Sequence, residues 1–142
     1  MTSPGPTSAG PLPSVTPEPN PDDAPFWTAA AEDRLVLPRC SSCGTFIWYP
    51  RAFCPDCHTM GVEWVDATGR GTIYSFTVNQ RGQGPWADHA PYVIAYVQLD
   101  EGPRVLTNIV GADPDGIRVG DAVTALFEPA GPTKVLRFTT AP

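Results

Sequence analysis

Four cysteines in two close pairs constrain this chain more than any other feature of its sequence. The first pair is Cys40 and Cys43, the second is Cys54 and Cys57, and ten residues separate the pairs. Two Cys-x-x-Cys turns joined by a short hairpin bring four sulfur atoms to one point, which is the ligand set of a closed tetrahedral zinc site. The sequence therefore predicts a Zn²⁺ site made of these four cysteines.

The expected role of this metal is structural. A closed four-cysteine site leaves no open coordination position, so a Lewis-acid role is not expected. Iron is the alternative metal, because rubredoxin-like knuckles use the same Cys-Pro-x-Cys turn and tetrahedral sulfur ligation does not separate the two metals. An electron carrier of the rubredoxin kind therefore stays open. His58 follows the fourth cysteine directly and is expected at the surface.

Charge and hydropathy narrow the classes of partner. The chain has 142 residues and a formal net charge of −6, and only Lys134 of its nine basic residues is a lysine. Because a phosphate backbone repels so acidic a chain, no nucleic-acid partner is expected. Zinc ribbons and OB barrels do bind nucleic acids in other proteins, so a nucleic-acid-binding module stays open as an alternative. No apolar stretch could span a bilayer and the N-terminus lacks a signal pattern, so we expect a cytoplasmic protein without a membrane partner.

The first two regions of the chain differ sharply in composition. Residues 1–25 contain eight prolines and little apolar bulk, so we predict a disordered tail or linker. Residues 26–34 are rich in alanine, and a short amphipathic helix is predicted there. Its apolar face would carry Phe26, Trp27, Ala30 and Ala31.

The remaining residues predict two all-β units. Residues 35–66 are too few to build a hydrophobic core, so the metal would supply the cross-link of a small zinc ribbon with strands at 35–37 and 45–49. Residues 67–142 alternate between apolar and polar residues and contain turn sequences between the segments. We predict a five-stranded OB-fold barrel there. Its expected strands are residues 72–79, 92–99, 104–110, 122–127 and 134–138.

The first barrel strand carries a clear alternating pattern. Thr72, Tyr74, Phe76 and Val78 recur at every second position, which predicts that all four lie on one face of the strand. The fold class expected for the whole chain is all-β, with a short helix, a rubredoxin-like zinc ribbon and then the barrel.

Several other residues are candidates for contacts with a partner or ligand. The ribbon carries Phe46, Trp48, Tyr49 and Phe53, which either pack against the barrel or stay exposed as a protein-docking surface. Arg51 lies beside the metal and could bind the phosphate of a cofactor such as coenzyme A. The long loop 80–91 carries Trp86 and His89, and loops of this length are often functional. We find no catalytic constellation in the sequence, so no catalytic residue of its own is expected and none is assigned.

From Phe26 to about Phe138 the chain resembles one family, the small zinc-ribbon and OB-fold proteins that accompany thiolase-superfamily enzymes. The matching features are the Phe26-Trp27 helix leading to Arg34-Leu35-Val36-Leu37, then Cys40-x-x-Cys43-Gly44, Tyr49-Pro50-Arg51, Cys54-Pro55-x-Cys57, Glu63-Trp64, the run from Gly69 to Val78, Ala90-Pro91-Tyr92 and Leu99-Asp100-Glu101-Gly102. The family pattern often has glycine after the fourth cysteine. His58 stands there instead, and it is expected to affect the turn of the knuckle but not the metal.

The resemblance implies a non-catalytic accessory subunit. Such proteins dock on a thiolase-like or lipid-transfer-protein-like aldolase subunit in a hetero-oligomer, and help to bind or channel an acyl-CoA thioester. In actinobacterial steroid catabolism a similar domain follows an enoyl-CoA-hydratase-like half. That domain activates an aldolase, which cleaves the steroid side chain by a retro-aldol step. The proline-rich head would then suit a linker from an upstream hydratase-like domain.

Overall fold

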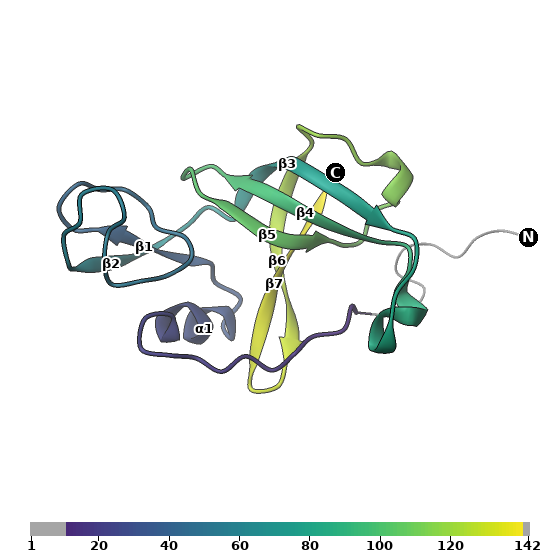
Figure 1. The fold of residues 1–142 in the computed structure, drawn as a ribbon, viewed down its shortest axis with the longest axis horizontal. Helices are drawn as coiled ribbons and strands as arrows, with labels where there is room; N and C mark the ends of the chain where they lie inside the picture. The colour runs from purple at the N-terminus through teal and green to yellow at the C-terminus, as the bar shows by residue number, and fades with distance from the viewer. Residues whose placement is uncertain (1–10, 141–142) are drawn as a thin grey trace, which may run out of the picture.

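The computed structural model describes residues 11–140, and it confirms the predicted fold class. The helix α1 (Ala24–Ala30) comes first and a two-stranded ribbon follows it (Figure 1). The ribbon and barrel strands are β1 (Val36–Cys40), β2 (Val62–Asp66), β3 (Arg70–Asn79), β4 (Tyr92–Leu99), β5 (Arg104–Ile109), β6 (Ala122–Ala130) and β7 (Thr133–Thr140). Two short 3₁₀ helices interrupt the barrel connections, η1 (Gly84–His89) and η2 (Pro114–Gly116).

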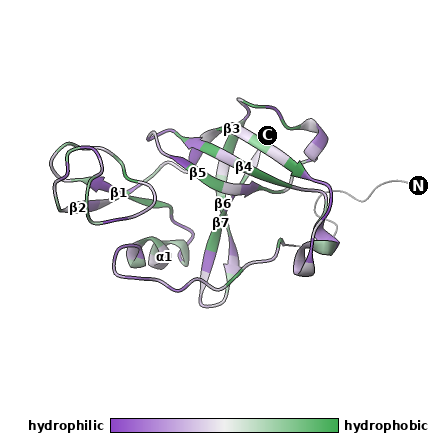
Figure 2. Ribbon diagram, in the orientation of Figure 1, coloured by the Kyte–Doolittle hydropathy of each residue, from purple (hydrophilic) through white to green (hydrophobic). Residues whose placement is uncertain are grey.

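The barrel closes in the order β3-β4-β5-β7-β6. All of its neighbouring strands are antiparallel except β5 and β7, which run parallel and share a single residue pair, Ile109 with Phe138. The β5–β7 seam is therefore the most weakly hydrogen-bonded part of the barrel wall. Hydrophobic residues lie along the barrel strands (green in Figure 2), and those facing inward form a core with almost no solvent exposure.

Strand β3 does not keep the strict alternation that the sequence predicts. Its pairing with β4 shifts register between Ile73 and Ser75, so Tyr74 is the extra residue of a β-bulge. Because a bulge reverses the faces on either side of it, Tyr74 is exposed whereas Phe76 and Val78 pack against the core. The prediction that Thr72, Tyr74, Phe76 and Val78 all share one face is therefore wrong, because Thr72 and Tyr74 are exposed while Phe76 and Val78 face the core.

The last two strands are longer than predicted. Strand β6 continues through Pro129 to Ala130, which pairs with Thr133 across a two-residue turn. Gly131 occupies that turn with a φ of 69°, a conformation that glycine adopts without steric cost. The turn predicted over residues 129–132 is therefore only two residues long.

The ribbon strands also differ from the prediction. The first predicted strand, 35–37, extends to Cys40 as β1, and its partner is β2, which the sequence analysis did not predict. Residues 45–49 form no strand, and only Phe46 bridges to Arg39. The strands β1 and β2 therefore join the two ends of the ribbon segment, and the two cysteine turns between these strands are loops.

Helix α1 begins two residues earlier and ends four residues earlier than the predicted span of 26–34. Asn20 caps the turn before it, because its side-chain oxygen accepts hydrogen bonds from the backbone N–H groups of Asp22 and Asp23. The helix ends where Asp33 takes a positive φ of 61° and the N–H of Arg34 donates to the carbonyl of Ala29, as in a Schellman motif.

The proline-rich segment has no helix or strand over residues 11–20. The described part of this segment runs extended along the barrel to α1 (Figure 1). The prediction made for residues 1–10 lies outside the described residues. Across residues 11–140, no helix has the length and apolar character needed to cross a membrane.

Candidate metal centre

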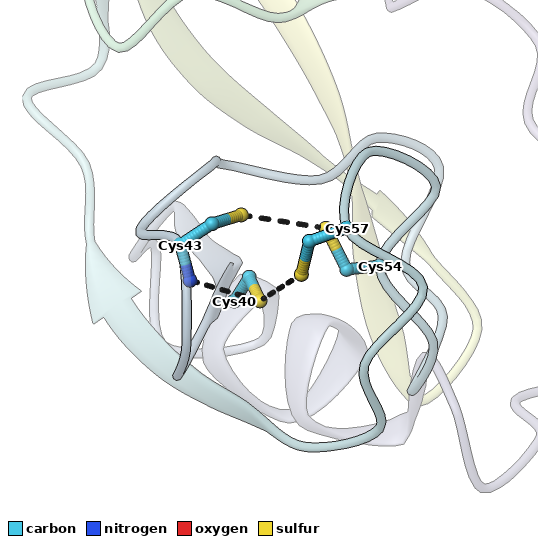
Figure 3. Close-up of side chains that lie close together, drawn as sticks. All are labelled: Cys40, Cys43, Cys54 and Cys57. Carbon is cyan, nitrogen blue, oxygen red and sulfur yellow. Dashed lines mark hydrogen bonds between the residues drawn. The ribbon is translucent and has the colours of Figure 1, made fainter.

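The four cysteine side chains converge from two loops, as Figure 3 shows. Their sulfur atoms all lie within 4.8 Å of one another. The Sγ atoms of Cys40 and Cys57 are 3.6 Å apart, and those of Cys43 and Cys54 are also 3.6 Å apart. Zinc–sulfur bonds of about 2.3 Å place tetrahedral sulfur atoms about 3.8 Å apart, so the four thiols fit one Zn²⁺ ion.

Both cysteine turns have the same backbone hydrogen bonds. The N–H of Gly44 donates to the carbonyl of Cys40, and the N–H of His58 donates to the carbonyl of Cys54, each over 3.0 Å. Gly44 has a φ of 78° and His58 a φ of 63°. The histidine thus adopts the left-handed conformation that glycine takes in the first turn, and the expected change in the turn of the second knuckle does not occur.

The hydroxyl groups of two threonines help to ionise the outer pair of thiols. The side chain and backbone of Thr45 lower the pKa of Cys43 to about 6 through hydrogen bonds to its sulfur. Thr59 lowers the pKa of Cys57 in the same way. In the thiol form each Sγ donates to the threonine hydroxyl over 3.3 Å. In the thiolate form the hydroxyl donates to the sulfur instead, which favours the ionised ligand that a metal ion requires.

The buried thiol of Cys54 is less acidic. The backbone N–H of Cys57 favours the thiolate of Cys54, but burial and the neighbouring sulfur atoms outweigh it and raise the pKa of Cys54 to about 11. A divalent cation would compensate the negative charge that accumulates there, because coordination deprotonates a thiol outright. The donor set therefore suits a closed metal site that shields its inner sulfur atoms from water.

Two of the predicted aromatic residues hold the ribbon to the rest of the molecule. Phe46 and Trp48 are partly buried against the main core, and the Trp48 ring contacts Phe26 of α1 with ring centroids 5.4 Å apart. Leu35 and Leu37 join the same core. The ribbon is therefore packed onto α1 and the barrel by ordinary hydrophobic contacts.

The other predicted ribbon residues stay at the surface. Tyr49 is 42% exposed and Phe53 is 41% exposed, and Arg51 is exposed as well. The Phe53 position bridges to Met60 across the second cysteine turn, where Met60 is 67% exposed. Phe53 and Met60 thus give the ribbon tip a small apolar surface.

Trp86 and His89 lie on η1, which Figure 1 shows at the end of the barrel away from the ribbon. Trp86 stacks on Tyr92 with ring centroids 4.6 Å apart, and His89 is partly exposed. The structure therefore does not bring these two residues together with the metal or the ribbon aromatics.

A second apolar surface, which no local sequence pattern indicates, lies on the outer face of strands β3 to β5. Tyr74, Tyr96 and Leu106 are each about half exposed or more, and Tyr96 lies opposite Leu106 in the pairing of β4 with β5. The guanidinium of Arg104 lies 3.7 Å from the ring centroid of Tyr74. Tyr74 lies on the outer face with Thr72, before the β-bulge turns Phe76 and Val78 toward the core.

A rubredoxin-like zinc ribbon packed against an OB-fold barrel defines the class of protein. Residues 27–63 match the family model "ChsH2, rubredoxin-like zinc ribbon domain" and residues 64–128 match "ChsH2, C-terminal OB-fold domain". In the solved structure "Ltp2-ChsH2(DUF35) aldolase", one chain is 37% identical to this chain. The two superpose with a TM-score of 0.80, over 89% of this chain and 99% of that one. The chain belongs to the DUF35 family, with the ChsH2 type of zinc ribbon and OB-fold domains.

Two curated relatives show how the names and lengths of similar proteins vary. A "Probable enoyl-CoA hydratase alpha subunit" of Thermomonospora curvata is 37% identical over 136 residues, which are 96% of this chain and 41% of that protein. The chain thus spans less than half of that relative's length. A "DUF35 domain-containing scaffold protein" of Methanothermobacter thermautotrophicus is 40% identical over 94 residues, 66% of this chain and 71% of that protein.

Proposed function

We propose that this chain is a non-catalytic scaffold subunit that docks on a thiolase-superfamily subunit, most specifically a lipid-transfer-protein-like aldolase. In this proposal the complex cleaves the side chain of a steroid acyl-CoA by a retro-aldol step. The chain supports the binding or channelling of the CoA thioester. The main support is its likeness to the DUF35 chain of the Ltp2–ChsH2 aldolase, which extends over nearly the whole of that chain.

The zinc ion has a structural role in this proposal. The inner core of the ribbon consists of Cys40, Ile47 and Cys54, with Val62 packed against it. So small a core cannot hold a loop structure by hydrophobic burial alone, and the metal supplies the missing cross-link. The zinc thereby holds the ribbon tip, with Phe53 and Met60, in one shape before a partner binds.

Docking would use exposed apolar residues on the ribbon and the barrel. Phe53 and Met60 lie at the ribbon tip, and Tyr96 and Leu106 lie on the barrel face. Large apolar and aromatic side chains contribute most of the binding energy in protein interfaces. Between the ribbon and the β4–β5 turn runs a groove of about 440 Å³, with Arg104 in its lining, which could receive a loop of the partner.

The basic residues give little support to a nucleic-acid role. In the part of the chain that the structure describes, Arg34, Arg39, Arg70, Lys134 and Arg137 each lie within 4.0 Å of a carboxylate. A phosphate backbone would have to compete with these acidic partners for the same cations. The arrangement of charge therefore favours a protein partner.

Co-expression with a lipid-transfer-protein-like aldolase subunit tests the proposal. We expect the two chains to elute together as a hetero-oligomer of defined mass in size-exclusion chromatography with light scattering. We also expect retro-aldol cleavage of a steroid acyl-CoA to need both chains. Elution of the two chains apart, with the same cleavage rate in the absence of this chain, would overturn the proposal.

A pair of variants locates the contact. Replacing Phe53 and Met60 together by serine should weaken the complex about tenfold or more, because central apolar residues of an interface each contribute about 1 kcal/mol or more. Val119→Ser is the matched control. Val119 is 64% exposed and belongs to the β5–β6 connection, outside the ribbon. Equal affinities of both variants would exclude the ribbon tip from the interface.

A further inference from the structure

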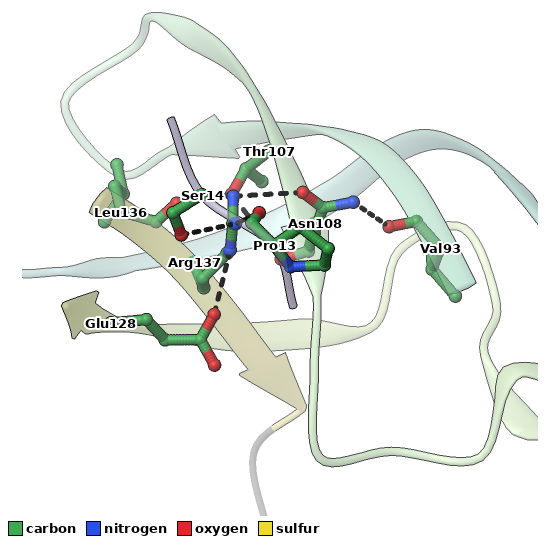
Figure 4. A network of polar contacts seen from close by, with 8 residues as sticks. All are labelled: Pro13, Ser14, Val93, Thr107, Asn108, Glu128, Leu136 and Arg137. Atoms are coloured by element: carbon green, nitrogen blue, oxygen red, sulfur yellow. Dashed lines mark hydrogen bonds and ion pairs between the residues drawn. The ribbon is translucent and has the colours of Figure 1, made fainter. Parts of the chain in front are cut away.

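Side chains reinforce the weak seam between β5 and β7, where a backbone hydrogen bond runs from the N–H of Val110 to the carbonyl of Phe138. The hydroxyl of Thr107 on β5 donates to the carbonyl of Leu136 on β7 over 3.2 Å. The amide of Asn108 donates to the carbonyl of Val93 over 2.8 Å, and its side-chain oxygen accepts from the guanidinium of Arg137 over 3.1 Å. Figure 4 shows these groups around Arg137.

Arg137 also reaches the proline-rich segment. Its Nε donates to Glu128 over 3.0 Å in a pair whose side chains are only 11% and 14% exposed. Its Nη2 donates to the backbone carbonyl of Pro13 over 3.0 Å and to the Ser14 hydroxyl over 3.4 Å. Since buried guanidinium donors are costly to leave without acceptors, the carbonyl of Pro13 completes the hydrogen bonding of a charge inside the barrel wall.

Two further contacts fix the path of the segment. Leu12 helps to line a cavity of about 310 Å³ at this seam, together with Tyr92 and Ile109. Thr16 lies against the β6–β7 turn so closely that a Cβ added to Gly131 would come within 2.7 Å of its hydroxyl oxygen. The segment is thus held at three successive points before it reaches α1.

We propose that the β5–β7 seam is a binding groove for an extended, proline-containing peptide, and that residues 11–16 of this chain occupy it in cis. Proline suits such a groove because it donates no backbone hydrogen bond and favours an extended chain. Arg137 donates a hydrogen bond to a backbone carbonyl of the peptide. The cavity binds the apolar side chain of the residue that precedes this carbonyl. The groove fixes the point at which polypeptide on the N-terminal side leaves the barrel, and this role is independent of the proposed partner.

A matched pair of substitutions in the segment tests this proposal in the full chain. Leu12→Asp places a charge in the apolar cavity, whereas Val15→Asp adds the same charge at a residue that is 86% exposed. Neither residue belongs to the barrel core, so both variants should fold. The measurement is the ¹⁵N heteronuclear NOE of the backbone N–H groups of residues 12, 14, 15 and 16.

In the unmodified chain and in Val15→Asp, we expect NOE values close to those of the barrel strands. In Leu12→Asp they should fall to less than half of those values, while the strands stay unchanged. Low values for the segment in the unmodified chain would overturn the proposal, and so would equal values in the two variants. Arg137→Lys serves as a second variant, because it keeps the charge but cannot reach Pro13 and Asn108 together, and it should lower the same NOE values.

Discussion

At the scale of single residues, one contact ties the ribbon to the start of the helix. The hydroxyl of Tyr49 donates to the carboxylate of Asp23 over 2.7 Å, and Asp23 is only 4% exposed. Burial alone would raise the pKa of Asp23, but the hydrogen bonds from Tyr49 and from the backbone N–H of Asn20 outweigh it and lower this pKa. Burial and the nearby carboxylate raise the pKa of Tyr49 to about 12.

Both shifts predict how the contact depends on pH. Asp23 has a lowered pKa in the folded state, so its contribution is present above the ordinary value of 3.8 and is lost as the pH falls through the lowered value. Tyr49 has a raised pKa, so its contribution is present below the ordinary value of 10.0 and is lost as the pH rises through about 12. The contact is therefore complete at neutral pH.

Tyr49→Phe should lower the free energy of unfolding by about 1 kcal/mol at pH 7, because it removes one hydrogen bond to a charged group, and the residue that donates this bond is 42% exposed to water. The loss should shrink as Asp23 becomes protonated below pH 3.8. Urea unfolding of both proteins across this range measures the difference. Tyr96→Phe is the control, since Tyr96 is 46% exposed on the barrel face. A loss that is the same at all pH values would contradict the assignment.

At the scale of elements, the approach of β3 to β4 depends on a glycine. A Cβ added to Gly71 would lie 2.4 Å from the backbone carbonyl oxygen of Gln98 and 2.8 Å from a methyl group of Val97. Gly71→Ala should therefore force the two strands apart and destabilise the barrel by about 2 kcal/mol. Thermal unfolding checks this, with Gly116→Ala as the control, because an added Cβ there meets no atom within 4 Å. Equal melting temperatures for the two variants would show that the strands yield without cost.

The barrel strands could be predicted from the sequence because apolar residues alternate along them and turn residues separate them. The bulge at Tyr74 could not, because an extra residue leaves the local pattern of alternation intact on each side and appears only in the pairing with β4. Strand β2 was missed for a related reason. Its five residues gain their pairing from β1, which is more than twenty residues away in the chain.

At the scale of the whole molecule, the spacing of the cysteines predicted the metal site correctly, since four thiols at these separations have one common meeting point. The exposed cluster of Tyr74, Tyr96 and Leu106 could not be predicted, because three different strands contribute it. The contact of Arg137 with Pro13 was equally hidden, since 124 positions separate the two residues. Such contacts depend on how the folded strands and segments pack against one another, and local sequence patterns carry no information about this packing.

We expect one zinc ion to hold the ribbon while hydrophobic packing holds the barrel, and elemental analysis together with a two-dimensional NMR spectrum distinguishes these two contributions. We predict one zinc per chain, since four cysteines form a single site. Zinc binding contributes about 10 kcal/mol or more to the folding of small zinc domains. A strong chelator should therefore collapse the dispersed signals of residues 38–62, and those of the barrel should persist. A chain without bound zinc whose ribbon signals remain dispersed would show that the ribbon does not depend on the metal.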